Sequence, residues 1–185
     1  VNVSKSLTSV DLSNNLVTHW FNAITGHYGK DLTGFRALTS AILTTGLMRN
    51  LNMMCNDLPR DAFELLRSMA QTKGLNTLCG FTSGQSEADL SNNQLRFVDA
   101  ELIAWDLEHG FVNTTLTSLN LSNNHFFGKK RDMTGIKAIA HAISTNKSLT
   151  HIDLSKNTLE MKGTKVIAHA IADSRSLASI NLASN

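Results

Sequence analysis

The histidines in the helical segments of this 185-residue chain are the side chains best placed to do chemistry. Aligning the segments puts Trp105, His141 and His169 at one register, off the apolar stripe. Packed helix axes lie roughly 8–10 Å apart, so two such histidines could share a metal ion. No Cys, Asp or Glu shares the register, and we expect no metal. The alternatives are a pH-sensitive or aromatic contact patch and ordinary surface residues.

Aspartate and serine also recur two residues apart, as Asp89 with Ser91 and Asp153 with Ser155, and His151 stands beside the second pair. Nucleophilic catalysis needs a hydroxyl, a base and an orienting group within hydrogen-bond reach. No histidine completes such a set at each pair, and the pairs recur because the surrounding pattern recurs. Neither a glycine-rich phosphate loop nor a nucleophile elbow is present. We therefore expect no enzyme activity and no cofactor.

Composition limits the classes of partner. Hydrophobic residues make up 42% and charged residues 17%, which indicates a folded chain. Lys and Arg number 17 against 15 for Asp and Glu, a net charge of +2 that predicts no nucleic-acid partner. No apolar run reaches the roughly 18 residues of a membrane span, and no secretory leader is visible. Two cysteines form no disulfide framework, which favours a cytoplasmic or otherwise intracellular protein.

One internal repeat organises the chain, with the spacing L-x-x-L-x-L-x-x-N-x-L. Its alternating apolar positions predict a short strand with one buried face, and its asparagine is expected to satisfy backbone groups of the turn. Stacked copies would align these asparagines in a ladder. Parallel strands need crossovers, usually helices. The copies start at Leu7, Met48, Leu116, Leu149 and Leu177, with a weaker one at Gln85. Helices are expected over 31–45, from Pro59 through Met69, and over 97–109, 132–145 and 161–172.

The string Leu-Thr-Ser-Leu-Asn-Leu-Ser-Asn-Asn at 116–124 and the Ala-Ile-Ala-His-Ala-Ile helix resemble the leucine-rich repeat family, in its ribonuclease-inhibitor-like subtype. The resemblance covers nearly the whole chain. It implies an α/β leucine-rich repeat solenoid, with parallel strands on the concave face and helices on the convex face. We expect a single domain over 1–185 of about six to seven repeats. Neither end carries a capping repeat, so we expect a fragment of a longer chain.

Two segments interrupt the repeat. Residues 18–30 are extra, and they include Trp20, Phe21 and Tyr28, which either cover an exposed core edge or contact a partner. Residues 75–86 are too few to join two parallel strands. Either 75–81 is not a strand of the sheet, or it pairs antiparallel with 87–91. We expect a discontinuity there, between blocks at roughly 1–74 and 87–185.

The expected concave face carries small polar side chains and no aromatic anchor. It is either a solvated repeat surface or a binding face for a basic or backbone-presenting partner. The candidate residues on it are Asn52, Asp89, Asn120, His151 and Asp153.

The resemblance implies a protein–protein interaction scaffold or adaptor within a larger chain or multi-subunit assembly. The alternatives are the ligand-sensing repeat region of a NOD-like receptor-type protein and a GTPase-activating regulator, since the GTPase-activating protein for Ran has such repeats. Flanking sequence would test the first alternative, and a GTP-hydrolysis assay the second.

Overall fold

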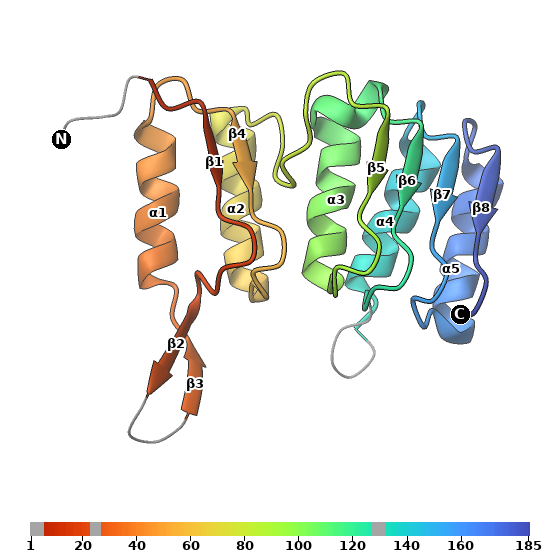
Figure 1. Cartoon of the computed structure of the whole chain (residues 1–185), viewed down its shortest axis with the longest axis horizontal. Coiled ribbons are helices and arrows are strands. Elements are labelled where there is room, and N and C mark those ends of the chain that lie inside the picture. The colour runs from red at the N-terminus through yellow and green to blue at the C-terminus, as the bar shows by residue number, and fades with distance from the viewer. Residues whose placement is uncertain (1–5, 23–26, 127–131) are drawn as a thin grey trace.

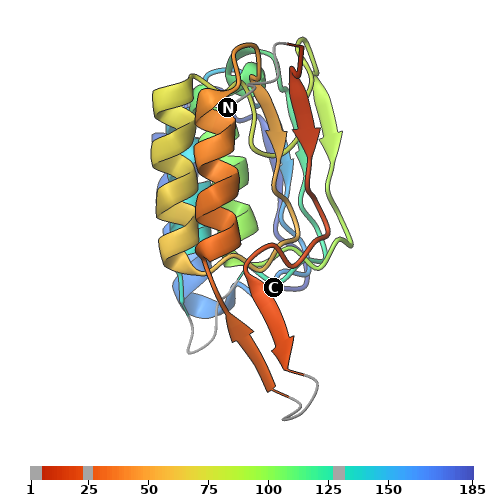
Figure 2. The same cartoon turned by 90° about the vertical axis from the view of Figure 1, so that its left-hand side faces the viewer.

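Short parallel strands line one side of the molecule, and helices line the other. Figure 1 shows the strands side by side, and Figure 2 shows the two layers from the end of the row. This computed structural model describes residues 6–22, 27–126 and 132–185. The strands on the long side are β1 (Ser9–Asp11), β4 (Asn50–Asn52), β5 (Glu87–Asp89), β6 (Ser118–Asn120), β7 (His151–Asp153) and β8 (Ser179–Asn181). The helices are α1 (Thr33–Thr44), α2 (Arg60–Lys73), α3 (Phe97–His109), α4 (Thr134–Thr145) and α5 (Glu160–Asp173), with a 3-10 turn η1 at Phe111–Thr114.

Each strand presents its central residue to the helices. Leu119 pairs in register with Ala88 on β5 and Ile152 on β7, and the side chains of Leu51, Leu119 and Ile152 are buried. The flanking residues of the same strands point away from the helices, as the period of two requires. The other apolar positions of the repeat join the helix faces in one continuous core. Each buried Leu or Ile contributes about 1.5–3 kcal/mol.

The helices begin and end close to the predicted bounds. Asp31 and Asp132 precede α1 and α4, and each carboxylate accepts the first helical N–H, from Thr33 at 2.8 Å and Thr134 at 2.9 Å. Gly135 follows because α4 starts against the α3 backbone: a Cβ there would lie 2.6 Å from the carbonyl oxygen of Phe97. The repeated Asp-x-Thr-Gly string thus starts both α1 and α4, and its glycine is sterically required in α4.

The predicted asparagine ladder forms in the second part of the chain. The Asn124 side chain donates to the carbonyl of Leu90 at 2.9 Å and accepts from the Asn93 backbone at 3.2 Å. Asn157 repeats this role for Asn124, and Asn185 for Asn157. Among the described residues, however, no such bond joins Asn56 to Asn93, and the buried Oδ1 of Asn56 has no partner. The ladder is therefore continuous only from Asn93 to the end.

The sheet divides at the same place. β1 pairs with β4, and β5 to β8 form a second parallel sheet. Residues 75–81 form no named strand. They run beside β4, where Leu51 donates to the Thr77 carbonyl at 3.2 Å and Met53 to the Leu78 carbonyl at 2.9 Å. Antiparallel pairing of this segment with 87–91 was the wrong alternative, because its bridges go to Asn50 and Asn52.

The insertion at 18–30 contains an antiparallel hairpin, β2 (His19–Asn22) with β3 (His27–Lys30), which projects from one end of the molecule (Figure 1). Its base is tied to the loop before α2. Lys30 Nζ donates to the Asp57 carbonyl at 3.0 Å, and His19 Nε2 lies 3.5 Å from the Asp57 carboxylate. Arg96, which precedes α3, contacts the same carboxylate at 2.5 Å. Asp57 thereby joins the hairpin to both parts of the sheet.

Candidate functional site

The outward side chains of β5 to β8 form two rows across the strand face, which is the side of the sheet away from the helices. The first row is Glu87, Ser118, His151 and Ser179, and the second is Asp89, Asn120, Asp153 and Asn181. Residues of both rows line a shallow hollow of about 300 Å³ on β6 to β8. Of the predicted candidates, Asn120, His151 and Asp153 line this hollow, and Asp89 continues the second row beside it on β5.

The second row has a structural role that explains its recurrence. Each Oδ1 accepts the backbone N–H two residues ahead, as in Asp89 with Ser91 at 2.9 Å and Asp153 with Ser155 at 2.8 Å. Such side-chain bonds close the turn after each strand. Hydrogen bonds from the Ser91 backbone and hydroxyl lower the pKa of the exposed Asp89 carboxyl. At Asp153, partial burial tends to raise the pKa, but the hydrogen bonds from Ser155 and Asn181 outweigh it and the pKa is lowered.

His151 is exposed in the hollow, with Nδ1 lying 2.8 Å from the Thr150 hydroxyl. That hydroxyl donates to the Thr117 carbonyl at 3.0 Å, so the imidazole must donate to it through Nδ1–H. An imidazole that donates to a hydroxyl is not a base toward it. The arrangement offers donors and acceptors for binding and does not activate Thr150 as a nucleophile.

A similar local role applies to Asn52 on β4. Its Oδ1 accepts the Met54 N–H at 3.2 Å, and its side chain lies against Gly80, where a Cβ would come within 3.0 Å of the amide nitrogen. Asn52 lines a separate hollow of about 350 Å³, beside Thr77 and Phe81 at the break. It is therefore not part of the hollow on β6 to β8.

The helix side contains a cleft between α2 and α3, with a volume of about 230 Å³. The α3 and α4 backbones run close together, whereas those of α2 and α3 hardly approach, because the repeat is interrupted between them. The cleft is lined by Arg60, Phe63, Glu64, Arg67 and Gln71 of α2, by Glu101, Ala104, Trp105, Glu108 and His109 of α3, and by Ala138 and His141 of α4.

Trp105 corrects one sequence prediction. It was expected in an exposed row with His141 and His169, but only 5% of it is exposed. The indole lines the α2–α3 cleft and stacks on His109, with ring centroids 5.3 Å apart. At this register the interruption leaves a space beside α3, and Trp105 lies there. His141 lines the same cleft, whereas His169 is exposed on α5 and does not line it.

Two buried carboxylates on α3 were missed by the sequence reasoning. Asp106 accepts the Thr77 hydroxyl at 2.5 Å, the Leu78 N–H at 2.7 Å and the Cys79 N–H at 3.1 Å. Burial raises its pKa to about 7, although these donors work in the opposite direction. The available signal was the apolar residues around Asp106 in this helix, such as Ile103 and Leu107, because a carboxylate buried among them needs donors.

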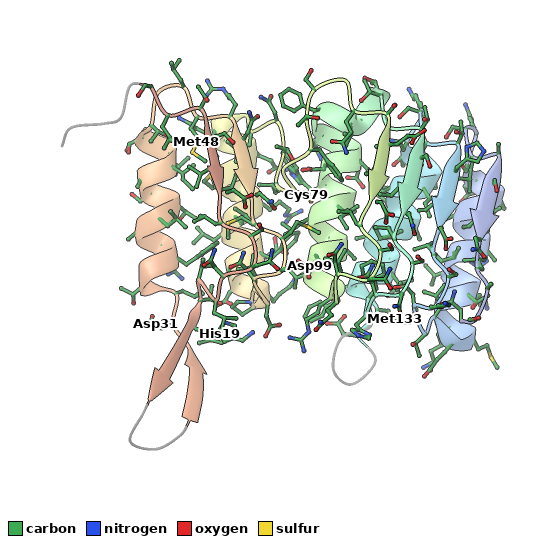
Figure 3. All side chains as sticks on the ribbon, viewed as in Figure 1. His19, Asp31, Met48, Cys79, Asp99 and Met133 are labelled. Atoms are coloured by element: carbon green, nitrogen blue, oxygen red, sulfur yellow. The ribbon has the colours of Figure 1, made fainter. Side chains whose placement is uncertain are left out.

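Asp99 acts in the same way at the other end of α3 (Figure 3). It accepts the backbone N–H groups of Cys55 and Arg96, each at 2.8 Å. Burial raises the pKa of Asp99 above its ordinary value, although the two N–H donors oppose it. Across the break, the α3 carboxylates thus provide bonds that the asparagine ladder provides elsewhere.

The two cysteines lie near these carboxylates as free thiols. Burial, with a smaller contribution from Asp99, raises the pKa of Cys55 to about 11. Burial, followed by the Asp106 charge, raises the pKa of Cys79 as well. Because the thiolate is the reactive form, both are poor nucleophiles in the folded protein.

The remaining predictions concern the hairpin aromatics, a metal site and a membrane span. The backbones of Trp20, Phe21 and Tyr28 lie in the β2–β3 hairpin, but their side chains are outside the described residues. Within 6–22, 27–126 and 132–185, no group of three His, Cys, Asp or Glu is placed to hold a metal ion. Helices long and apolar enough to cross a bilayer are likewise absent from these ranges.

The strands, crossover helices and asparagine ladder define a protein built from structural repeats. Residues 115–135, which contain the best copy of the frame, match the Leucine Rich Repeat family. Together with the recurrence of that frame along the chain, this match supports a leucine-rich repeat protein.

No curated protein matches the sequence. The C-terminal domain of tropomodulin from Caenorhabditis elegans is similar at 14% identity, over 92% of this chain and 86% of that one, with a TM-score of 0.41. An overlap of that quality supports no conclusion about fold details or function.

Proposed function

We propose that this chain is a non-enzymatic protein-interaction module, a ribonuclease-inhibitor-like leucine-rich repeat solenoid that acts as a scaffold or adaptor. In this proposal, residues 1–185 form one domain of about six to seven repeats within a larger chain or assembly. The observation that supports it best is the strand face, where two rows of polar side chains run in register across four strands.

The chemistry of this face suits a partner that presents backbone or basic groups. Asp89 and Asp153 have lowered pKa values, so both are ionised at neutral pH and accept hydrogen bonds. The side-chain amides of Asn120 and Asn181 hydrogen-bond these carboxylates, Asn120 to Asp89 and Asn181 to Asp153 at 2.9 Å, and each keeps a second N–H for a partner. A wide, shallow and polar surface of this kind binds through many modest contacts.

A native pull-down with mass spectrometry tests the proposal. We expect the wild-type chain to recover a stoichiometric protein partner. The double variant His151→Lys with Ser179→Lys places two ammonium groups in the first row, where they repel basic groups of the partner, and should lose that partner. Ala168→Lys, on the exposed side of α5, adds the same charge to the opposite side and should retain it.

Capture that is unchanged by the strand-face variant would contradict this assignment of the face. Recovery of the chain alone would contradict a constitutive scaffold and would favour a conditional receptor or regulator. The described residues give no separate support to the NOD-like receptor or GTPase-activator alternatives.

The hairpin is a second proposed contact, through Trp20, Phe21 and Tyr28. Its anchoring by Asp57 holds it in a defined direction without placing it in the core. Replacing all three aromatics by serine should preserve the melting temperature and reduce partner recovery. A collapse of the fold would instead identify these residues as packing groups.

A further inference from the structure

Two buried polar atoms in the α2–α3 cleft have no hydrogen-bond partner in the described part of the chain. They are the indole Nε1 of Trp105, a donor, and Oε2 of Glu101, an acceptor. The two residues are one helical turn apart on α3 and line the same cleft. Their side chains are 5% and 7% exposed. Because buried polar groups in native proteins are nearly always bonded, this pair indicates an absent partner.

Two of the side chains that line the cleft, Arg60 of α2 and His109 of α3, are partly exposed. Arg60 pairs with the other Glu101 oxygen and with Glu64 at 3.0 Å, and its guanidinium lies 5.4 Å from the centre of the Phe63 ring. His109 stacks on the Trp105 indole. The Arg60 and His109 side chains are 51% and 46% exposed, so both can turn outward and admit a ligand.

We propose that this cleft binds a carboxamide, the side chain of a glutamine or asparagine on a protein partner. A carboxamide offers an N–H donor to Glu101 Oε2 and a carbonyl acceptor to Trp105 Nε1 at once. The partner here rests on the proposed interaction function, but the cleft lies on the opposite side of the sheet from the strand face. Its volume of about 230 Å³ holds one side chain and excludes a helix.

Charge argues for a neutral ligand. Arg60 and Arg67 line the cleft and repel a cation. A cationic group such as an ammonium also offers no acceptor to the indole N–H of Trp105. Glu64, Glu101 and Glu108 line the cleft as well and repel an anion, which has no donor for Glu101. A carboxamide meets both buried atoms without adding a charge to this mixed environment.

Nuclear magnetic resonance of the indole N–H groups tests the proposal directly. The chain has two tryptophans, and Trp20→Phe assigns the Trp105 signal. The probes are N-acetyl-glutamine N-methylamide and N-acetyl-methionine N-methylamide, which share their backbone amides and differ at the side chain. We expect a saturable shift of the Trp105 indole with the glutamine probe, with Kd in the millimolar range typical of so small a ligand.

Glu101→Gln replaces one acceptor oxygen by a donor and should weaken the glutamine probe at least tenfold. The Trp20 indole reports non-specific effects in the same spectrum and should not move. Equal shifts with both probes, or no shift at saturating probe, would overturn the proposal. The titration needs no partner protein. A negative pull-down therefore contradicts the proposed scaffold function, whereas a negative titration contradicts only the carboxamide site.

Discussion

The Asp106 carboxylate on α3 accepts the Thr77 hydroxyl at 2.5 Å, across the interruption of the repeat. The same carboxylate accepts the N–H groups of Leu78 and Cys79. Residues 75–81 are thus hydrogen-bonded to β4 through the carbonyls of Thr77 and Leu78. The N–H groups of Leu78 and Cys79 join the same segment to α3. Stability and pH response of the protein should therefore depend on this single buried side chain.

Replacing Asp106 by alanine should lower the free energy of unfolding by about 3 kcal/mol, because three buried donors lose their acceptor. Asp89→Ala is the matched control, since Asp89 is exposed and closes a solvated turn. It should cost under about 1 kcal/mol. Urea unfolding followed by circular dichroism measures both values. A loss at Asp106 no greater than that at Asp89 would contradict this role.

The raised pKa of Asp106 predicts a pH dependence of stability. Its pKa is about 7 in the folded protein and 3.8 in the unfolded chain, so the native state binds more protons between these values. The contribution of this group is fully present below about pH 4 and is lost as the pH rises through about 7. It amounts to about 4 kcal/mol at most. Urea midpoints of wild type and Asp106→Asn should diverge over this range, and parallel curves would refute the assignment.

Gly135 and Gly34 provide a matched pair at equivalent helix positions. A Cβ on Gly135 would lie 2.6 Å from the Phe97 carbonyl oxygen, whereas nothing lies within 4 Å of a Cβ on Gly34. Gly135→Ala should destabilise by about 2 kcal/mol, because the α3 backbone has to shift. Gly34→Ala should stabilise by up to about 1 kcal/mol through helix propensity. Melting temperatures that move in the same direction would show that α3 and α4 are not packed this tightly.

Thiol labelling checks the environment of the cysteines. At pH 8 in native buffer, a disulfide reagent such as dithionitrobenzoate should react slowly with both thiols, because burial raises both pKa values. Cys79 should be the slower of the two, since it is the more buried. In urea both should react at the rate of a model thiol. Fast native labelling of the Cys79 thiol would contradict the packing described around Asp106.

Sequence spacing anticipated the regular part of the fold well. The frame positions Leu119 and Ile152 predicted buried strand centres, and Asn124 and Asn157 predicted the ladder. Both follow from local periods of two and from one repeated turn. The candidate residues of the strand face, His151 and Asp153, could be placed for the same reason.

The α2–α3 cleft could not be predicted in this way. The sequence predicts Trp105 in an exposed row because its register lies off the apolar stripe, yet it is buried beside the interruption. The bond from Cys55 to Asp99 and the bond from Thr77 to Asp106 come from donors more than twenty residues away in the chain. No periodic pattern carries that information, since α4 and α5 have no carboxylate at the positions equivalent to Asp99 and Asp106.

The sequence by itself determined the repeat, its strands and helices, and the ladder asparagines, because each copy meets the same neighbours and so requires the same residues. Only the tertiary structure decided what happens where the copies fail to match. At the interruption, residues do not meet the neighbours that the equivalent residues of the other copies meet. The positions of Thr77, Asp106, Glu101 and Trp105 depend instead on how two unequal blocks pack against the segment between them.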